Sequence, residues 1–187
     1  MGAADASGSG PVGGVVLVVA RWTEDVSWLD AIPHPAIVVQ KDRDCPNVGR
    51  EAASWLWFME TARIDPRTTY AFLQGDPFPH AVTAGDLRPV DRFTPIGGHV
   101  YRCDREAAPQ HAGLPLVRCA RDWFGAVLPD EIVFHAGAQF LIPGRVIRRR
   151  SRRWYADLRR MVEAEEKGAW VLERMWGLVW RRDRTRK

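Results

Sequence analysis

Apolar residues fall into short unbroken runs in the first part of the chain, and these runs predict strands. Gly14–Ala20 is a continuous β-branched run, which is typical of a strand covered on both faces, as in a parallel sheet. Ala36–Gln40 and Tyr70–Leu73 predict two further strands. The stretch 132–142 predicts a strand, a turn and a strand, with Gly137 at a tight backbone position.

Helical spacing of apolar residues predicts the elements between and after these strands. Ala52–Arg63 consists largely of good helix formers, with Asn47 placed to cap the helix and Glu51 in its first turn. Further helices are expected over 117–128, 145–166 and 169–182. Strands alternating with helices predict an α/β fold: three layers, a mostly parallel twisted sheet and a helical C-terminus.

Composition favours a single domain. The chain has 187 residues, of which 46% are hydrophobic and 27% charged, enough for one substantial core. We expect a flexible Gly- and Ser-rich lead over 1–14, one domain over 15–182 and a basic tail over 183–187. Residues 83–115 show no sustained period, so we expect a lid or acceptor loop there, or short elements.

Cysteine usage and hydropathy favour a cytoplasmic protein. The three cysteines include no CxxC pair, which fits a reducing compartment better than a disulfide scaffold. The apolar run Val15–Ala20 is too short to span a bilayer. His99, Cys103, His111 and Cys119 follow no common zinc spacing, so we expect no structural zinc there.

Charge is uneven along the chain. Residues 1–90 hold 7 Lys and Arg against 11 Asp and Glu, whereas residues 91–187 hold 20 against 12. The arginine-rich run 145–160 and the tail could attract nucleic acid, an anionic membrane or a phosphorylated substrate, or could form a solvated helix face. No helix-turn-helix, ribonucleoprotein or zinc-finger signature accompanies the arginines, which disfavours a dedicated nucleic-acid binder.

The most informative stretch is Tyr70–His80, where a buried strand breaks into polar residues. Gln74, Gly75 and Asp76 follow the apolar run, and two prolines then fix the backbone before His80. In an open α/β sheet, ligands bind at the carboxyl edge of the strands, so this segment predicts a binding site. The alternative is an ordinary strand followed by a Pro-rich turn.

Two other segments carry candidate binding residues. Gly49 beside Arg50 at a helix start would let the backbone approach an anion that Arg50 then clamps, although a capped helix with one exposed arginine explains the same residues. After the first strand come Arg21, Glu24 and Asp25. The two acids could contact a ribose or base edge, or could charge the first turn of a short helix.

Glu173 is the candidate catalytic base. Helical spacing places it in a stripe with Trp170, Trp176 and Trp180 on the last helix. A buried acid needs a partner or a task. Glu173 could pair with Arg174, Arg50 or Arg21 and be structural. It could instead be a general base whose pKa is raised by the indoles around it.

Several of these stretches resemble one family, the domain of unknown function 3431 (DUF3431), which is itself similar to minimal glycosyltransferases of the GT-A type. The similar segments are VVARWTEDVSWL (18–29), PNVGREAASWL (46–56), FLQGDPFPH (72–80), PDEIVFHAGAQFLIPGRVIRRR (129–150) and WVLERMWGLVW (170–180). They occur in the family's order and cover most of the chain. The resemblance implies a GT-A-like fold and transfer of a sugar from a nucleotide sugar to a hydroxyl acceptor.

The resemblance also implies roles for the candidate residues. Arg21, Glu24 and Asp25 would lie near the nucleotide, and Asn47 and Arg50 near its phosphates. Gln74, Asp76 and His80 would occupy the place of the metal-binding D-x-D motif, with Asp76 as a ligand of Mg²⁺ or Mn²⁺ or as a base. Glu173 would approach the acceptor. Only one carboxylate remains of the D-x-D motif, so without a metal Arg50 and Arg174 would neutralise the diphosphate.

The acceptor and the activity stay open at this point. The chain is short for such a transferase, so the acceptor is small, a partner or second copy completes the site, or catalysis has been lost. The competing functions are therefore a glycosyltransferase-like enzyme, a non-catalytic sugar- or phosphate-binding protein, and a binder of anionic surfaces or nucleic acid.

Overall fold

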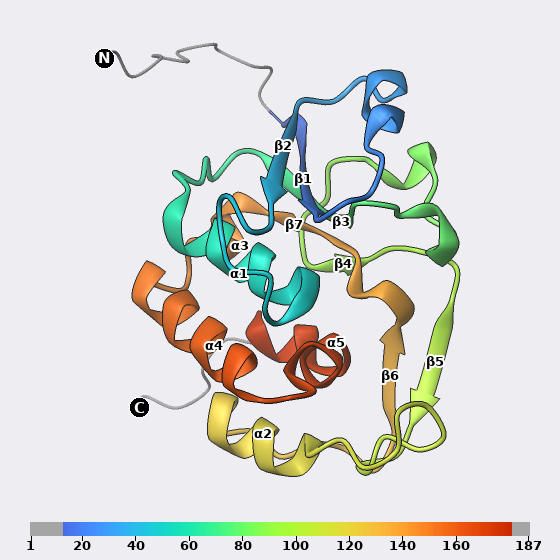
Figure 1. Cartoon of the computed structure of the whole chain (residues 1–187), viewed down its shortest axis with the longest axis vertical. Helices are drawn as coiled ribbons and strands as arrows, with labels where there is room; N and C mark the ends of the chain where they lie inside the picture. The colour runs from blue at the N-terminus through green and yellow to red at the C-terminus, as the bar shows by residue number, and fades with distance from the viewer. Residues whose placement is uncertain (1–12, 181–187) are drawn as a thin grey trace.

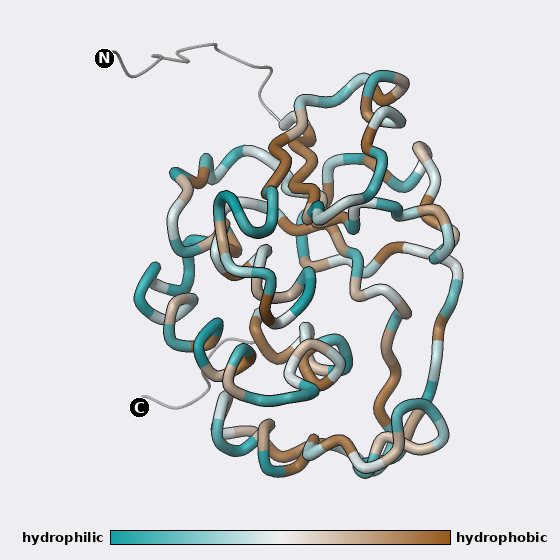
Figure 2. The backbone as a smooth tube through the Cα atoms, in the orientation of Figure 1, coloured by the Kyte–Doolittle hydropathy of each residue, from teal (hydrophilic) through white to brown (hydrophobic). Residues whose placement is uncertain are grey.

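The computed structural model describes residues 13–180, and a five-stranded sheet organises them (Figure 1). The strands stand in the order β2-β1-β3-β7-β4. Their bounds are β1 Val15–Arg21, β2 Ala36–Gln40, β3 Thr69–Gln74, β4 Thr94–Pro95 and β7 Phe140–Pro143. The β-branched runs identified in the sequence form β1 and β2, and β1 and β3 stand out as apolar stretches of the chain (Figure 2).

The sheet is mixed, and β7 alone runs against the other strands. β1 pairs in parallel with β2 and β3, whereas β7 is antiparallel to both β3 and β4. The amino end of β7 therefore lies at the carboxyl edge of β1, β2 and β3. The predicted α/β class is confirmed.

The two faces of the sheet carry different coverings. On one face, Val18, Phe72 and Phe140 pack against the helices. On the other, Leu17, Leu73 and Leu141 pack against Val82, Leu87 and Ile96 from the segment 82–96, and against the 3₁₀ turn η1 (Ser27–Ala31). The third of the expected layers is thus built from turns and loops, not from α-helices.

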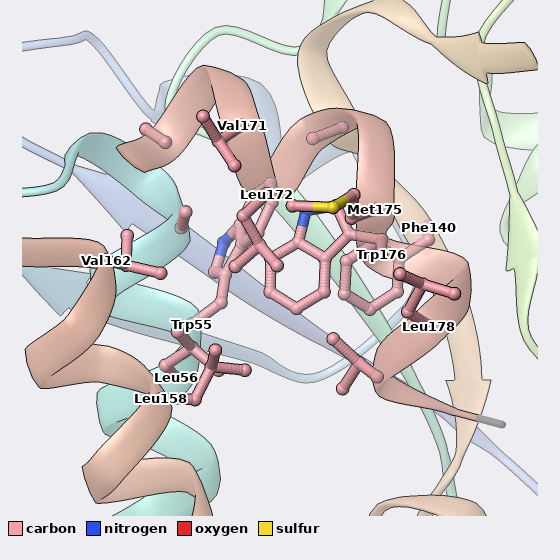
Figure 3. Close-up of a cluster of buried hydrophobic side chains, with 14 of the residues drawn as sticks. Trp55, Leu56, Phe140, Leu158, Val162, Val171, Leu172, Met175, Trp176 and Leu178 are labelled. Carbon is pink, nitrogen blue, oxygen red and sulfur yellow. The ribbon is translucent and has the colours of Figure 1, made fainter. Parts of the chain in front are cut away.

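Five α-helices are present in residues 13–180. They are α1 Arg50–Thr61, α2 Leu116–Phe124, α3 Gly144–Ile147, α4 Arg152–Ala164 and α5 Gly168–Val179. Helices α1, α4 and α5 lie together beside the sheet, and α2 lies against α5 (Figure 1). Figure 3 shows their shared core, in which Trp55 and Trp176 meet Phe140 with ring centroids 5.7 and 4.8 Å apart.

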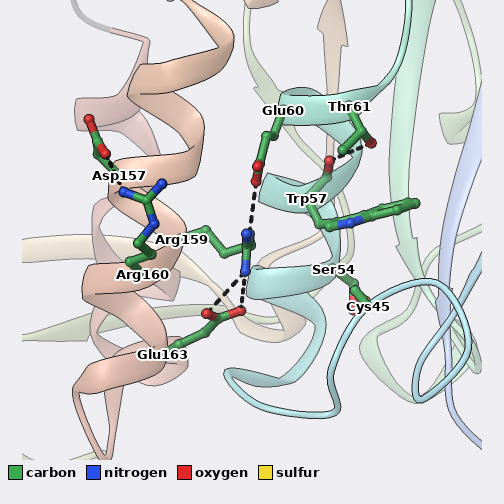
Figure 4. A network of polar contacts seen from close by, with 9 residues as sticks. All are labelled: Cys45, Ser54, Trp57, Glu60, Thr61, Asp157, Arg159, Arg160 and Glu163. Carbon is green, nitrogen blue, oxygen red and sulfur yellow. Dashed lines mark hydrogen bonds and ion pairs between the residues drawn. The ribbon is translucent and has the colours of Figure 1, made fainter.

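A half-buried ion network also joins α1 to α4. Arg159 on α4 donates to Glu60 Oε2 at 2.9 Å and to Glu163 Oε1 at 2.8 Å, so one guanidinium connects the two helices (Figure 4). Its side chain is 16% exposed, which limits the screening of the pairs by solvent. The network adds a directional contact to an otherwise apolar packing.

The single helix predicted over 145–166 is wrong, because the chain breaks between α3 and α4. Ser151 caps α4, and its Oγ accepts a hydrogen bond from the Trp154 N–H at 3.1 Å. The buried Tyr155 hydroxyl donates to the Ile147 carbonyl oxygen at 2.7 Å, which satisfies the end of α3. Similarly, the helix expected over 117–128 ends at Phe124, because Gly125 adopts a left-handed φ of 58°.

Asn47 is not the cap of α1, contrary to the prediction. The N-cap is Gly49, with a φ of 74° and no side-chain capping hydrogen bond, and Asn47 is exposed. A Cβ at Gly49 would lie 2.8 Å from the Ala53 Cβ, so both the left-handed backbone and the close packing require glycine.

Short elements fill the long segment 83–115. The turn η3 (Ala84–Asp86), strand β4 and strand β5 (Val100–Cys103) lie in it. Strand β5 pairs with β6 (Ile132–His135) in a separate antiparallel ribbon, so the two strands predicted over 132–142 belong to different sheets. Between them lies the turn η4 (Ala136–Ala138), which contains Gly137.

Two expectations concern the chain ends. The predicted lead over 1–14 falls almost wholly outside the described residues, as do the tail over 183–187 and the last residues of the helix predicted over 169–182. Within residues 13–180, none of the helices combines the length and the apolar character that a bilayer crossing requires.

Candidate functional site

A pocket of about 260 Å³, lined by charged, polar and aromatic side chains, lies at the carboxyl edge of the parallel strands. Its walls come from the end of β3, the first turn of α1, the ribbon β5–β6, the turn η4 and the first turns of α5. The predicted site residues that line it are Arg50, Gln74, His80, Glu173 and Arg174. The sequence therefore identified residues from three distant segments that the fold brings together.

Glu173 forms one wall of the pocket, with both carboxylate oxygens hydrogen-bonded. Oε1 accepts from the Gly137 N–H at 2.8 Å, and Oε2 accepts from Arg174 Nη1 at 2.9 Å. The side chain is only 14% exposed. Burial raises the pKa of Glu173, and Glu51 across the pocket raises it further, although the contacts to Arg174 and Gly137 oppose this.

Arg174 is fully buried behind Glu173 and holds the surrounding chain in place. Besides Glu173, its guanidinium donates to the carbonyl oxygens of Trp170 and Gln110 at 2.7 and 3.3 Å. It lies 3.0 Å from His111 Nδ1 and 4.3 Å from the centroid of the Phe134 ring. Because its Nη atoms are already occupied, Arg174 is poorly suited to clamp a ligand phosphate.

Burial and the nearby charge of Arg174 favour the neutral form of His111. Burial lowers the pKa of His111, and the positive charges of Arg174, Lys167 and Arg50 lower it further. A neutral ring leaves Nδ1 free to accept a hydrogen bond from Arg174. His111 is thus a polar, uncharged group of the pocket near neutral pH.

Gln74 and His80 define the side of the pocket nearest the sheet. Gln74 Nε2 donates to the Gly137 carbonyl oxygen at 3.1 Å, and Gln139 Oε1 accepts from the Gln74 N–H at 3.0 Å. His80 packs on Gly137, where a Cβ would lie 2.5 Å from His80 Cδ2. Gly137 has a φ of 77°, so this tight position requires glycine, as predicted.

Arg50 stands at the pocket mouth on the first residue of α1. Its side chain is 57% exposed, and its Cζ lies 5.2 Å from the centroid of the Trp170 ring. The Nε lies 3.6 Å from Glu51 Oε2, a loose contact that leaves donors free for a ligand. This is the arrangement expected for anion recognition at a helix start.

Asp76 lies outside the pocket, in the exposed turn after β3. Its Oδ1 accepts a long hydrogen bond of 3.4 Å from the Phe78 N–H. No group of three or more His, Cys, Asp or Glu side chains in residues 13–180 could hold a metal ion. The residues around Asp76 therefore do not fit a Mg²⁺ or Mn²⁺ site.

Arg21, Glu24 and Asp25 build the turn after β1 and do not line the pocket. Arg21 donates to the Glu24 carbonyl oxygen at 2.8 Å and to Gln40 Oε1 at 3.0 Å. Glu24 Oε2 accepts from the Trp22 N–H at 2.6 Å, and Asp25 accepts from both the N–H and the hydroxyl of Ser27 at 2.9 Å. Neither Asn47 nor Gly49 lines the pocket.

Sequence reasoning missed several residues of the pocket. Tyr101, Gln110 and His111 lie in the segment 83–115, where no periodic pattern marks them. Glu51 was assigned only to the first turn of α1, yet it faces the pocket. The sequence does offer an indication for Glu51, because it is adjacent to Arg50, a predicted anion-binding residue.

Comparison of the chain with protein-family models, with curated proteins and with solved structures gave no match. The resemblance to DUF3431 and to GT-A glycosyltransferases thus stays a prediction from the residues.

Proposed function

We propose that the pocket is the reaction site of a glycosyltransferase-like enzyme that moves a sugar from a nucleotide sugar to a hydroxyl acceptor. The observation that carries the proposal is Glu173, a largely buried carboxylate with a raised pKa that lines a pocket at the carboxyl edge of an α/β sheet, where ligands bind in such folds. A raised pKa moves a carboxylate toward the range in which it accepts a proton well near neutral pH.

In this mechanism Glu173 takes the proton of an acceptor hydroxyl as the oxygen attacks the anomeric carbon. The new carbon–oxygen bond forms while the bond to the nucleoside diphosphate breaks, and the electron pair leaves with the diphosphate. Gln74 and His80 would bind sugar hydroxyls. The guanidinium of Arg50 and the amino end of α1 would face the negative charge of the leaving group.

The size and charge of the pocket suit the sugar better than the whole donor. Arg50 and Arg174 balance Glu51 and Glu173, so the interior favours a neutral hydroxylated group. Its volume of about 260 Å³ lies below the roughly 300–1,000 Å³ typical of sites for drug-sized ligands. The nucleotide would extend past Arg50 along the exposed sheet edge.

A thermal-shift series tests the proposal. UDP- and GDP-sugars should raise the melting temperature, because they bind the folded state only. Arg50→Gln should reduce the shift in melting temperature. Arg88→Gln, which changes an exposed arginine outside the pocket, should leave that shift unaltered. Absence of a shift with every nucleotide sugar, with and without Mn²⁺, contradicts the proposal.

Binding without turnover is the second candidate, and one observation favours it. Both oxygens of Glu173 already accept hydrogen bonds, as in a structural carboxylate. The two functions separate in Glu173→Gln: an enzyme loses transfer activity and keeps donor binding. If the wild type binds a nucleotide sugar but transfers nothing to water or to simple glycoside acceptors, the binding protein is the correct description.

A further inference from the structure

A second cavity, larger than the pocket, lies at the opposite edge of the sheet. It is a cleft of about 760 Å³ between the loop 62–67, which follows α1, and the break between α3 and α4. The first residue of β3 pairs with the last residue of β7 beside it. The cleft is therefore separate from Glu173, and the argument below does not rest on the proposed function.

Arginines dominate the walls of this cleft. Arg63 and Arg67 come from one side, and Arg148, Arg150 and Arg152 from the other, whereas the one acid in the lining is Asp65. Met59, Ile64, Ile147 and Tyr155 form the floor. The break at Ser151, which the sequence did not reveal, is what turns the arginine run into one wall of a hollow.

Four of the cleft arginines, Arg63, Arg67, Arg148 and Arg152, retain unused donor capacity. Within residues 13–180, no hydrogen bond or ion pair joins the side chain of Arg63 or Arg148 to an acceptor. The side chain of Arg67 makes only long contacts of 3.4 Å to Asp65, and the side chain of Arg152 donates one hydrogen bond, to the Ala62 carbonyl oxygen at 3.0 Å. Hydrogen bonds from the backbone and the side chain of Arg67 lower the pKa of Asp65, and the positive charges of Arg67 and Arg148 lower it further.

The two walls are fixed to each other by the backbone. The Gly144 N–H donates to the Thr68 carbonyl oxygen at 2.7 Å, and the Arg145 N–H donates to that of Pro66 at 3.1 Å. A Cβ at Gly144 would lie 2.0 Å from the Asp65 carbonyl oxygen, so only glycine allows this approach. The cleft is therefore formed before any ligand arrives, which reduces the entropy lost on binding.

We propose that this arginine cleft (Arg63, Arg67, Arg148, Arg150 and Arg152) binds a small molecule or headgroup carrying several phosphate groups. Guanidinium groups match phosphate oxygens in paired hydrogen bonds, and several of them around one hollow suit several phosphates. A nucleic acid fits less well, because Tyr155, the one aromatic ring of the lining, is buried and offers no face on which a base could stack.

Titration calorimetry with inorganic tripolyphosphate tests this binding. The full chain should bind it saturably, with an affinity that falls as salt is added. Arg63→Gln/Arg148→Gln should weaken binding about tenfold or more, since hydrogen bonds to charged groups are among the strongest. The matched control, Arg88→Gln/Arg153→Gln, removes two exposed arginines elsewhere and should bind like the wild type.

Further arms separate the sources of the phosphates. Phosphatidylcholine vesicles with and without phosphatidylinositol bisphosphate test a lipid headgroup, and inositol hexakisphosphate tests a free ligand. The proposal is supported if the wild type binds in either arm, the Arg63→Gln/Arg148→Gln variant loses that binding and the Arg88→Gln/Arg153→Gln control keeps it. The proposal is overturned if neither arm binds, if both variants weaken binding equally, or if single-stranded RNA binds more tightly and equally in both variants.

Discussion

The backbone N–H of Gly137 donates a hydrogen bond to Glu173 Oε1 at 2.8 Å, which joins the turn before β7 to helix α5. Both residues come from segments that are far from each other in sequence, and both are held in place by tight contacts. The carboxylate is consequently oriented by the backbone as well as by Arg174. Several measurable properties follow from this arrangement.

Glu173 should make the stability of the fold depend on pH. Its pKa in the folded protein lies above the ordinary value of 4.5, so the folded state holds this proton more tightly than the unfolded state does. Its contribution to stability is therefore fully present below about pH 4.5 and is lost as pH rises through the folded-state pKa. The unfolding free energy of the wild type, measured relative to Glu173→Gln by urea denaturation, should fall across this window.

A wild-type to Glu173→Gln difference that stays constant from about pH 4 to about pH 8 would contradict this expectation. The comparison with Glu173→Gln cancels groups elsewhere in the chain that titrate in both proteins. Glu166→Gln, a change at an exposed carboxylate outside the pocket, serves as the control.

Loss of Arg174 should destabilise the protein strongly. Arg174→Leu leaves the buried Glu173 carboxylate without its cation and frees the carbonyl oxygens of Trp170 and Gln110, so we expect a loss of about 3–5 kcal/mol. Adding Glu173→Gln to Arg174→Leu should recover part of the loss, because the unpaired charge is then removed. Equilibrium unfolding of the two single variants and the double variant measures the coupling, and strictly additive losses would refute it.

Gly137→Ala should be far more damaging than alanine at another left-handed glycine. A Cβ at Gly137 would lie 2.5 Å from His80 Cδ2, whereas nothing lies within 4 Å of a Cβ at Gly125, which has a φ of 58°. At either position, we expect the strained backbone to lower the free energy of unfolding by about 1 kcal/mol. At Gly137, the clash with His80 should lower it further. Thermal unfolding of Gly137→Ala and Gly125→Ala measures the two losses. Adding His80→Ala should restore part of the stability lost in Gly137→Ala and none of that lost in Gly125→Ala.

The arginine that joins α1 to α4 should matter more than its exposed neighbour. Arg159→Met removes contacts to Glu60 and Glu163 at a position only 16% exposed, and we expect a loss of about 1–3 kcal/mol. Arg160→Met removes an exposed pair with Asp157 and should change stability by less than about 1 kcal/mol. Equal losses in chemical denaturation would show that α1 and α4 are held by apolar packing alone.

Apolar runs and helical spacing predicted β1, β2, β3, β6, β7 and most helices, because each is determined largely by its own residues, whereas β4 and β5 were not predicted. The β-branched residues of Val15 to Ala20 favour a buried strand, and the helix formers after Arg50 favour a helix. What failed depends on distant partners. The break at Ser151 needs the contact between Tyr155 and Ile147, and the division of 132–142 between two sheets needs β5, which lies some thirty residues earlier.

The pocket was predicted in part for the same reason. Arg50, Gln74, His80 and Glu173 stand out because each is a polar residue beside an apolar element. Asp76 has the same signal but turns into solvent, since the turn after β3 is closed locally by the Phe78 N–H. His111 stood out only in a His and Cys series without zinc spacing, and nothing linked it to the pocket, because its place is determined by Arg174, which is distant in sequence.

Because β7 enters the sheet at the edge where β1 to β3 leave it, the pocket combines the turn before β7 with a side chain from the end of β3. The site cannot assemble from the first half of the chain, since its inner wall arrives only when Phe140 has paired with Phe72. Ligand binding would then report on the completion of folding. An N-terminal fragment that stops short of Phe140 should have no affinity for the ligand, even if β1 and β3 have formed.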